Sequence, residues 1–133
     1  MKNNDLNIRT KEFAKAVIRM ANDLPNNRVG WTITDQIVRS STSVAANYRA
    51  VSRAKSDKDF IYKMAIVIEE ADDTHFWLDM VDELNLINKE TQKSNKAIQT
   101  NDLDIKNLIK EANELVAIFV SSTKTIKKRL NKK

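Results

Sequence analysis

Turn-forming residues are nearly absent from this chain. Its 133 residues include one Gly and one Pro. Folds built from β-strands need such residues at short intervals, because each reversal of the chain requires a turn that Gly or Pro favours. A chain of this length buries roughly two thirds of the surface that it exposes when unfolded, so one domain over residues 1–133 is expected. The sequence therefore predicts a single all-α domain of long helices.

The chemistry available to the chain is narrow. There is no Cys, which excludes disulfides, thiolate metal ligands and cysteine nucleophiles, and His75 is the single imidazole. The N-terminal segment lacks the apolar core of a signal peptide, and no apolar run approaches the roughly 18 residues of a membrane span. We therefore expect a cytoplasmic protein that does not enter a membrane.

Apolar residues recur with the period of an α-helix in four segments. The predicted helices cover about residues 5–24, 33–54, 57–86 and 97–130, with a polar connection at 88–95. The first ends before Pro25, because the residue before a proline disfavours the helical conformation, and the stretch from Pro25 to Gly30 is expected to be a loop. Thr32 or Thr34 is expected to cap the second helix and Ser56 the third. Four amphipathic helices with short links predict an antiparallel up-and-down four-helix bundle.

The third predicted helix is apolar on more than one side. Opposite its core stripe lies a second row, which consists of Ile66, Trp77, Val81 and Leu84. Large apolar patches are uncommon on the surface of monomers, so this row predicts an interface in a homo-oligomer. The alternative is that Trp77 leans over the core edge of its own protomer.

A strip of small and amide residues flanks the core stripe of the second helix. It includes Gln36, Ser43 and Asn47. Small side chains at helical spacing let two backbones approach closely, so we expect this strip to be packed and to contribute to the oligomer interface. The alternative is that its hydroxyl and amide groups face water.

Several blocks of the sequence carry a resemblance to a known family. They are QIVRSSTSVAAN at 36–47, Arg53, DFI at 59–61, EEADDTHFWL at 69–78, EANEL at 111–115 and FVSSTKT at 119–125. In these blocks the chain resembles the bacterial four helix bundle protein family, first noted as encoded by intervening sequences in large-subunit ribosomal RNA genes. The resemblance covers roughly residues 10–130 and implies a ring-like homopentamer. The family is in turn similar to accessory variability determinant proteins of diversity-generating retroelements, which implies RNA or DNA and a reverse transcriptase as partners.

One departure from the family pattern changes the local charge. Many members read Asn-Ile-Ala-Glu-Gly after the Ser/Ala stretch, whereas here Asn47 is followed by Tyr48, Arg49, Ala50 and Val51. A property that depends on the family's glutamate therefore does not transfer to this chain, and Arg49 adds a positive charge.

Catalytic and metal-binding patterns are weak. Asp72 and His75 have the spacing of half a carboxylate–histidine metal site, but a di-iron bundle needs two such histidines. His75 is expected to be a packed, hydrogen-bonded side chain, and the acids around it spread over the helix without the geometry of a catalytic pair. No glycine-rich loop is present to hold a phosphate. We therefore expect a non-enzyme without cofactor or metal.

The candidate nucleic-acid-binding cations lie in two segments, residues 39–55 and 124–129. Residues 57–86 carry nine acids and two bases, whereas residues 107–133 carry seven bases and two acids. The candidate nucleic-acid-binding residues are Arg39, Arg49, Arg53, Lys55, Lys124, Lys127, Lys128 and Arg129. Such patches would bind phosphates in a salt-dependent manner with little sequence preference. The alternative function is a protein–protein interaction scaffold that binds no nucleic acid.

Overall fold

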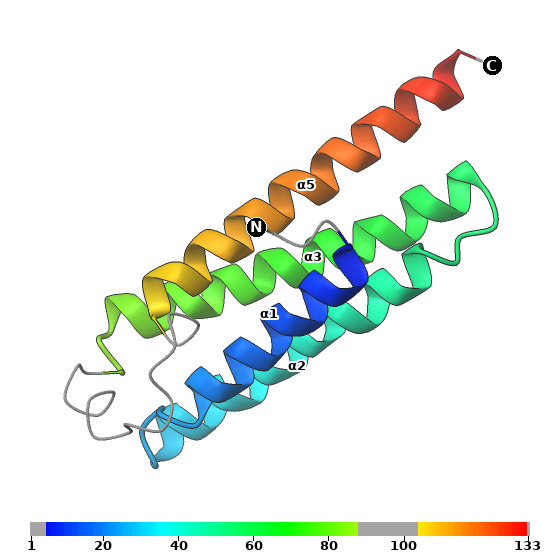
Figure 1. The fold of residues 1–133 in the computed structure, drawn as a ribbon. Helices are drawn as coiled ribbons and strands as arrows, with labels where there is room; N and C mark the ends of the chain where they lie inside the picture. Colours follow the sequence, from blue (N-terminus) through cyan, green and yellow to red (C-terminus); the bar gives the residue numbers. More distant parts are fainter. Residues whose placement is uncertain (1–4, 88–103, 133) are drawn as a thin grey trace.

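The structure, a computed structural model, describes residues 5–87 and 104–132. The helices are α1 (Leu6–Ala21), α2 (Arg28–Val51), α3 (Asp57–Glu83) and α5 (Ile105–Asn131). Figure 1 shows them packed side by side as a bundle in which each helix runs antiparallel to the one before it. The predicted all-α four-helix bundle is therefore confirmed. The predicted connection at 88–95 and the predicted helical residues 97–103 lie outside the described residues.

Each helix begins at a polar N-cap whose side chain accepts a hydrogen bond from a backbone amide. Asp5 accepts from Asn7, Asn27 from Gly30, Ser56 from Asp59 and Asp104 from Lys106. These bonds satisfy amides that have no partner inside the helix. The predicted cap at Ser56 is confirmed.

The predicted start of the second helix is wrong. α2 begins at Arg28, and Thr32 lies inside it, where its hydroxyl donates to the carbonyl of Arg28 at 2.9 Å. Gly30 was expected in a loop, but it is a buried helical residue without a positive φ. A Cβ at Gly30 would lie 1.7 Å from the carbonyl oxygen of Pro25, so this glycine permits close approach of the backbone and does not serve a turn.

Each of the first three helices ends three residues before its predicted end. The residues that follow α1 and α2 form hydrogen-bonded turns. The amide of Leu24 donates to the carbonyl of Ala21, and the amide of Ala54 donates to the carbonyl of Val51. Leu24 is buried although it lies beyond α1. The apolar period therefore continues past the last helical residue, because the turn that follows still points a side chain inward.

The core lies between all four helices. Its largest fully buried side chains are Phe119, Met20, Ile37, Met64, Leu78 and Leu115. α1 and α3 each pack against α2 and α5, so α1 and α3 occupy diagonal corners of the bundle. α1 is also the shortest helix and begins near the middle of the bundle, so the C-terminal part of α5 extends past it (Figure 1).

Candidate nucleic-acid interface

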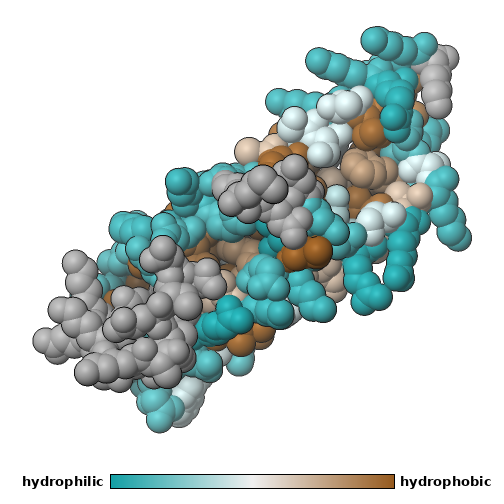
Figure 2. Space-filling view, viewed as in Figure 1, coloured by the Kyte–Doolittle hydropathy of each residue, from teal (hydrophilic) through white to brown (hydrophobic). Residues whose placement is uncertain are grey.

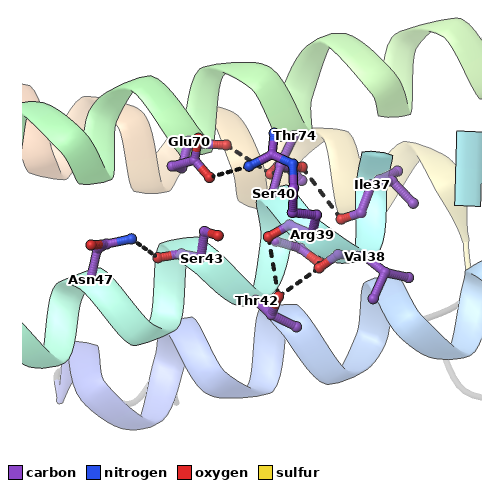
Figure 3. A network of polar contacts seen from close by, with 10 residues as sticks. Ile37, Val38, Arg39, Ser40, Thr42, Ser43, Asn47, Glu70 and Thr74 are labelled. Atoms are coloured by element: carbon purple, nitrogen blue, oxygen red, sulfur yellow. Dashed lines mark hydrogen bonds and ion pairs between the residues drawn. The ribbon is translucent and has the colours of Figure 1, made fainter. Parts of the chain in front are cut away.

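Two of the predicted phosphate-binding arginines are engaged in ion pairs. Arg39 Nη1 lies 3.1 Å from Glu70 Oε2, which joins α2 to α3 (Figure 3). Arg129 contacts both carboxylate oxygens of Asp57, at 3.0 and 2.6 Å, and this hydrogen bonding raises the pKa of the Arg129 guanidinium. The carboxylate in each pair offsets the positive charge of its arginine. Arg39 and Arg129 are therefore weaker candidates for binding a phosphate than an unpaired arginine would be.

A second group of cations surrounds a shallow depression at the end of α2. The depression has a volume of about 450 Å³ and is lined by Ala46, Arg49, Ala50, Arg53, Lys55 and Lys63. Within residues 5–87 and 104–132, no ion pair joins the side chain of Arg49, Arg53 or Lys55 to a carboxylate. Ala46 and Ala50 have short side chains, so they leave the floor of the depression open to a ligand. Such a ligand would lie beside Arg49, Arg53 and Lys55.

The depression continues into a longer groove between α1 and α2. This groove has a volume of about 820 Å³ and shares Ala46, Arg49 and Arg53 with the depression. Lys11 and Lys15 line its α1 side. From Thr42 to Arg53 the groove follows α2 for roughly 16 Å at the helical rise of about 1.5 Å per residue.

The α5 lysines lie at the same end of the molecule as the depression. Lys124, Lys127 and Lys128 are exposed on the last turns of α5. α2 and α5 run in the same direction, so their C-terminal ends lie at one end of the bundle (Figure 1). At that end, hydrophilic side chains project around patches of more apolar surface (Figure 2). We call this surface the basic end, defined as Arg49, Arg53, Lys55, Lys124, Lys127 and Lys128.

Acids near the basic end are already engaged. Asp59 accepts from Lys63 Nζ at 2.8 Å and from the Lys55 amide at 3.1 Å, and these hydrogen bonds hold the pKa of the Asp59 carboxyl below its ordinary value. Asp57 is paired with Arg129, as described above. Both acids are therefore partly neutralised, and the cations of the basic end dominate its charge.

The predicted oligomer-interface row of α3 separates into exposed and buried members. Ile66 and Leu84 are exposed, and Trp77 is partly buried against the core, with its ring 5.1 Å from that of Phe76. Val81 requires a correction: it is 1% exposed and belongs to the hydrophobic core of its own protomer. Its position on the helix turns it inward, so it does not belong to the exposed row.

The predicted interface strip of α2 is half-buried. Asn47 Nδ2 donates to the Ser43 carbonyl at 2.8 Å, and Gln36 is likewise partly exposed. One turn away, Ser40 Oγ is buried 2.9 Å from Thr74 Oγ1 of α3 (Figure 3). Part of the close approach that these small residues allow is therefore used within the protomer, between α2 and α3.

His75 is a partly buried side chain that lies beside Asp79. Its Nδ1 lies 3.4 Å from Asp79 Oδ2, and its side chain is 24% exposed, at the core edge. Among residues 5–87 and 104–132, no group of three or more His, Asp and Glu side chains is arranged to hold a metal ion. In the same part of the chain, no helix is long and apolar enough to cross a membrane.

The sequence predictions missed three cations that line these surfaces. Lys11, Lys15 and Lys63 belong to helices that were predicted, but only the packing of α1 and α3 beside α2 places them next to Arg49 and Arg53. The spacing of Lys11 and Lys15, four residues apart on one face of α1, was the available signal.

Comparison with known families agrees with the fold. The family model of the 23S rRNA-intervening sequence protein matches residues 2–121. This chain belongs to the 23S rRNA-intervening sequence protein family. The match spans α1, α2, α3 and the part of α5 that contributes buried core residues.

A solved structure supports the same assignment. The chain is similar to a protein with unknown function from the S23 ribosomal protein family of Bacteroides thetaiotaomicron, with a TM-score of 0.70 and 26% identity. The similarity covers 89% of this chain and 97% of that one. No curated protein matches this chain.

Proposed function

We propose that this member of the 23S rRNA-intervening sequence protein family binds RNA or DNA through its basic end, without catalysis. The observation that carries the proposal is the group of Arg49, Arg53 and Lys55 around one depression; in the described part of the chain, no carboxylate lies within ion-pair distance of their side chains. Phosphates are the ligands that such a group fits best, since arginine offers paired donors to phosphate oxygens.

The floor of the depression favours backbone contact over base recognition. Its lining residues include no aromatic side chain on which a base would stack, and Ala46 and Ala50 leave room for a sugar–phosphate chain to approach. Binding would then depend on counterion release and would fall with added salt. Little sequence preference is expected.

Assembly would strengthen binding at this surface. Each copy in a ring-like homopentamer would contribute one basic end, so a long nucleic acid would contact several sites at once. The exposed apolar side chains of α3 are available for such an assembly. A reverse transcriptase is the proposed protein partner, on the resemblance described above.

The test is a pair of charge-reversal variants with equal changes in net charge. Arg49→Glu with Arg53→Glu should weaken binding to an RNA or a DNA oligonucleotide by at least about tenfold at low salt, because two phosphate contacts become repulsive. The control is Arg28→Glu with Lys110→Glu, two exposed residues at the opposite end of the bundle. It should retain most of the affinity.

The slope of affinity against salt gives a second readout. Loss of two phosphate contacts should reduce the slope by about two. Equal losses in both variants would show that net charge, and not the basic end, governs binding. If the wild-type protein binds neither RNA nor DNA at low salt, the proposal is overturned and an interaction scaffold becomes the better function.

A further inference from the structure

The groove between α1 and α2 carries cations on both of its walls. Lys11 and Lys15 line the α1 side, and Arg49 and Arg53 line the α2 side. On each helix the two cations are four residues apart, which separates them by roughly 6 Å along the helix axis. Because α1 and α2 are antiparallel, the direction toward the basic end runs from Lys15 to Lys11 on one wall and from Arg49 to Arg53 on the other (Figure 1).

The cations of the groove are open to a ligand. In the described part of the chain, no carboxylate lies within ion-pair distance of Lys11, Arg49 or Arg53. Lys15 Nζ lies 3.2 Å from Glu12 Oε1, and both side chains are about half exposed. A pair this exposed contributes little stability, so a phosphate can replace Glu12 beside Lys15 at small cost.

Small side chains line the groove between the cations. Ala45 and Ala46 belong to this lining, together with Thr42 and Ser52. The hydroxyls of Thr42 and Ser52 each donate to a backbone carbonyl of α2 at 2.7 Å. These hydroxyl protons are therefore engaged within the helix and do not read base edges. A positively charged groove of this kind fits the backbone of a nucleic acid.

The lining does not fit a helix of a partner protein. Docking of an amphipathic helix in a groove depends on several large apolar anchors at helical spacing. Ile8 is the one large apolar residue among the described residues that line this groove. A polyanion therefore fits the groove better than an amphipathic helix does.

The groove is too narrow for a duplex to enter. The axes of two packed helices lie about 8–10 Å apart. The major groove of B-DNA alone is about 12 Å wide, so the whole duplex is wider than the space between α1 and α2. A duplex would rest on the outer ends of the side chains, above Ala45 and Ala46. One strand can lie between the walls and contact the cations of both helices together.

We infer that a single strand of RNA or DNA lies along this groove, with its phosphates between the lysines of α1 and the arginines of α2, and continues into the basic depression. Ala46, Arg49 and Arg53 line both surfaces, so the path is continuous. The inference rests on the proposed function and adds to it the kind of nucleic acid and the path of the strand.

The inference makes the protein prefer a single strand to a duplex. A duplex has the higher charge density, so electrostatic attraction alone favours the duplex. The test compares an unstructured strand of about 12 nucleotides with its duplex at low salt, by fluorescence anisotropy. The wild-type chain should bind the strand at least about fivefold more tightly, because only the strand contacts both walls.

Charge reversal of the α1 wall tests the path of the strand. Lys11→Glu with Lys15→Glu should weaken binding of the strand by at least about tenfold, because one wall becomes repulsive. The control is Arg28→Glu with Lys110→Glu, which changes the net charge equally and should retain most of the affinity. The milder Lys11→Gln with Lys15→Gln would replace the charge-reversal variant if circular dichroism shows that it fails to fold.

A neutral substitution tests the space between the walls. Ala46→Leu narrows the groove without a change in charge, so it should weaken binding of the strand by about threefold or more and leave duplex binding and the salt slope unchanged. Ala46 is exposed on α2 and leucine has nearly the helix preference of alanine, so this variant should fold.

Four results would each overturn the inference. They are a duplex that binds as tightly as the strand, a Lys11 and Lys15 variant that matches its control, an Ala46→Leu variant with unchanged strand binding, and displacement of the strand by polyglutamate as readily as by unlabelled strand. The last would show that the groove recognises negative charge alone. Loss of affinity in Arg49→Glu with Arg53→Glu would still support the proposed function in each case, whereas wild-type affinity in that variant would overturn both.

Discussion

The two halves of α5 follow the same sequence pattern but have different surroundings. The first half contributes Leu108, Ala112, Leu115 and Phe119, all buried. The second half continues the period with Thr123, Ile126 and Leu130, yet none of its residues is buried. The difference coincides with the start of α1, which covers only the first half (Figure 1).

The boundary between the halves is visible at Phe119. Its ring stacks on Tyr48 of α2 with centroids 5.7 Å apart. Burial, followed by the charge of Asp5 at the start of α1, raises the pKa of the Tyr48 hydroxyl above its ordinary value. The start of α1 therefore lies near this aromatic pair. Helical periodicity shows which face of α5 is apolar, and the length of a neighbouring helix decides how much of that face is buried.

The largest expected effect tests the two halves with the same substitution. Leu115→Ala removes a fully buried side chain and should lower the free energy of unfolding by about 2–5 kcal/mol. Leu130→Ala, in the half without α1, should cost less than about 1 kcal/mol because its side chain is already partly hydrated. Urea denaturation of both variants would measure this, and equal losses would contradict the comparison.

A smaller effect is expected at the turn that brings α1 against α2. Gly30→Ala places a Cβ against the backbone of Pro25, so the connection has to move. The expected loss is about 1–3 kcal/mol, since forced overpacking outweighs the helix preference of alanine over glycine. Thermal unfolding would measure it. An increase in stability would show that the turn relaxes easily and does not fix the position of α1.

The ion pair between α1 and the covered half of α5 should contribute less. Arg9 Nε and Nη2 each lie 2.7 Å from a carboxylate oxygen of Glu111, and Nη2 lies 3.2 Å from Glu114. These hydrogen bonds raise the pKa of the Arg9 guanidinium. Arg9→Met should lower stability by about 1–2 kcal/mol, because the arginine side chain is only 12% exposed.

The matched control for Arg9 is Arg129→Met, which removes an exposed bidentate pair from the uncovered half of α5. Arg129→Met should lower the free energy of unfolding by less than Arg9→Met does, since solvent screens exposed pairs. A cost at Arg129 equal to that at Arg9 would show that coverage by α1 does not strengthen ion pairs on α5.

The smallest effect is a pH dependence near the basic end. Hydrogen bonds from Lys63 and the Lys55 amide hold the pKa of Asp59 below its ordinary value. The stabilisation is therefore present above the unfolded pKa of about 3.9 and is lost as the pH falls through the lower folded value. Titration by NMR should find the pKa of Asp59 depressed in the wild type and closer to its ordinary value in Lys63→Ala. An unchanged pKa in that variant would assign the effect to the Lys55 amide.

Most of the fold could be predicted from the sequence because each of its determinants is local. The scarcity of Gly and Pro, the helical period and the cap at Ser56 each act over a few residues. The start of α2 was misplaced because Gly30 has the local signature of a turn, whereas its role is to let Pro25 approach closely.

The candidate site was only partly predictable. The sequence identifies Arg39, Arg129 and Arg53 as cations of equal promise, and only the packing shows that the first two have carboxylate partners on α3. Lys63 belongs to α3, whose sequence is mainly acidic, and the packing of α3 against α2 places it in the lining of the basic depression. The net charge of a segment does not reveal which of its charges are paired across helices.

The sequence by itself determined that this protein is helical and which face of each helix is apolar. Those properties depend on neighbours one or two turns away, which the chain order fixes. The tertiary structure decided that α5 is covered only as far as Phe119 and that Arg39 and Arg129 are paired with acids of α3. Each of these depends on which helices are adjacent and how far they overlap, because burial and ion pairing are set by distances between residues far apart in the chain.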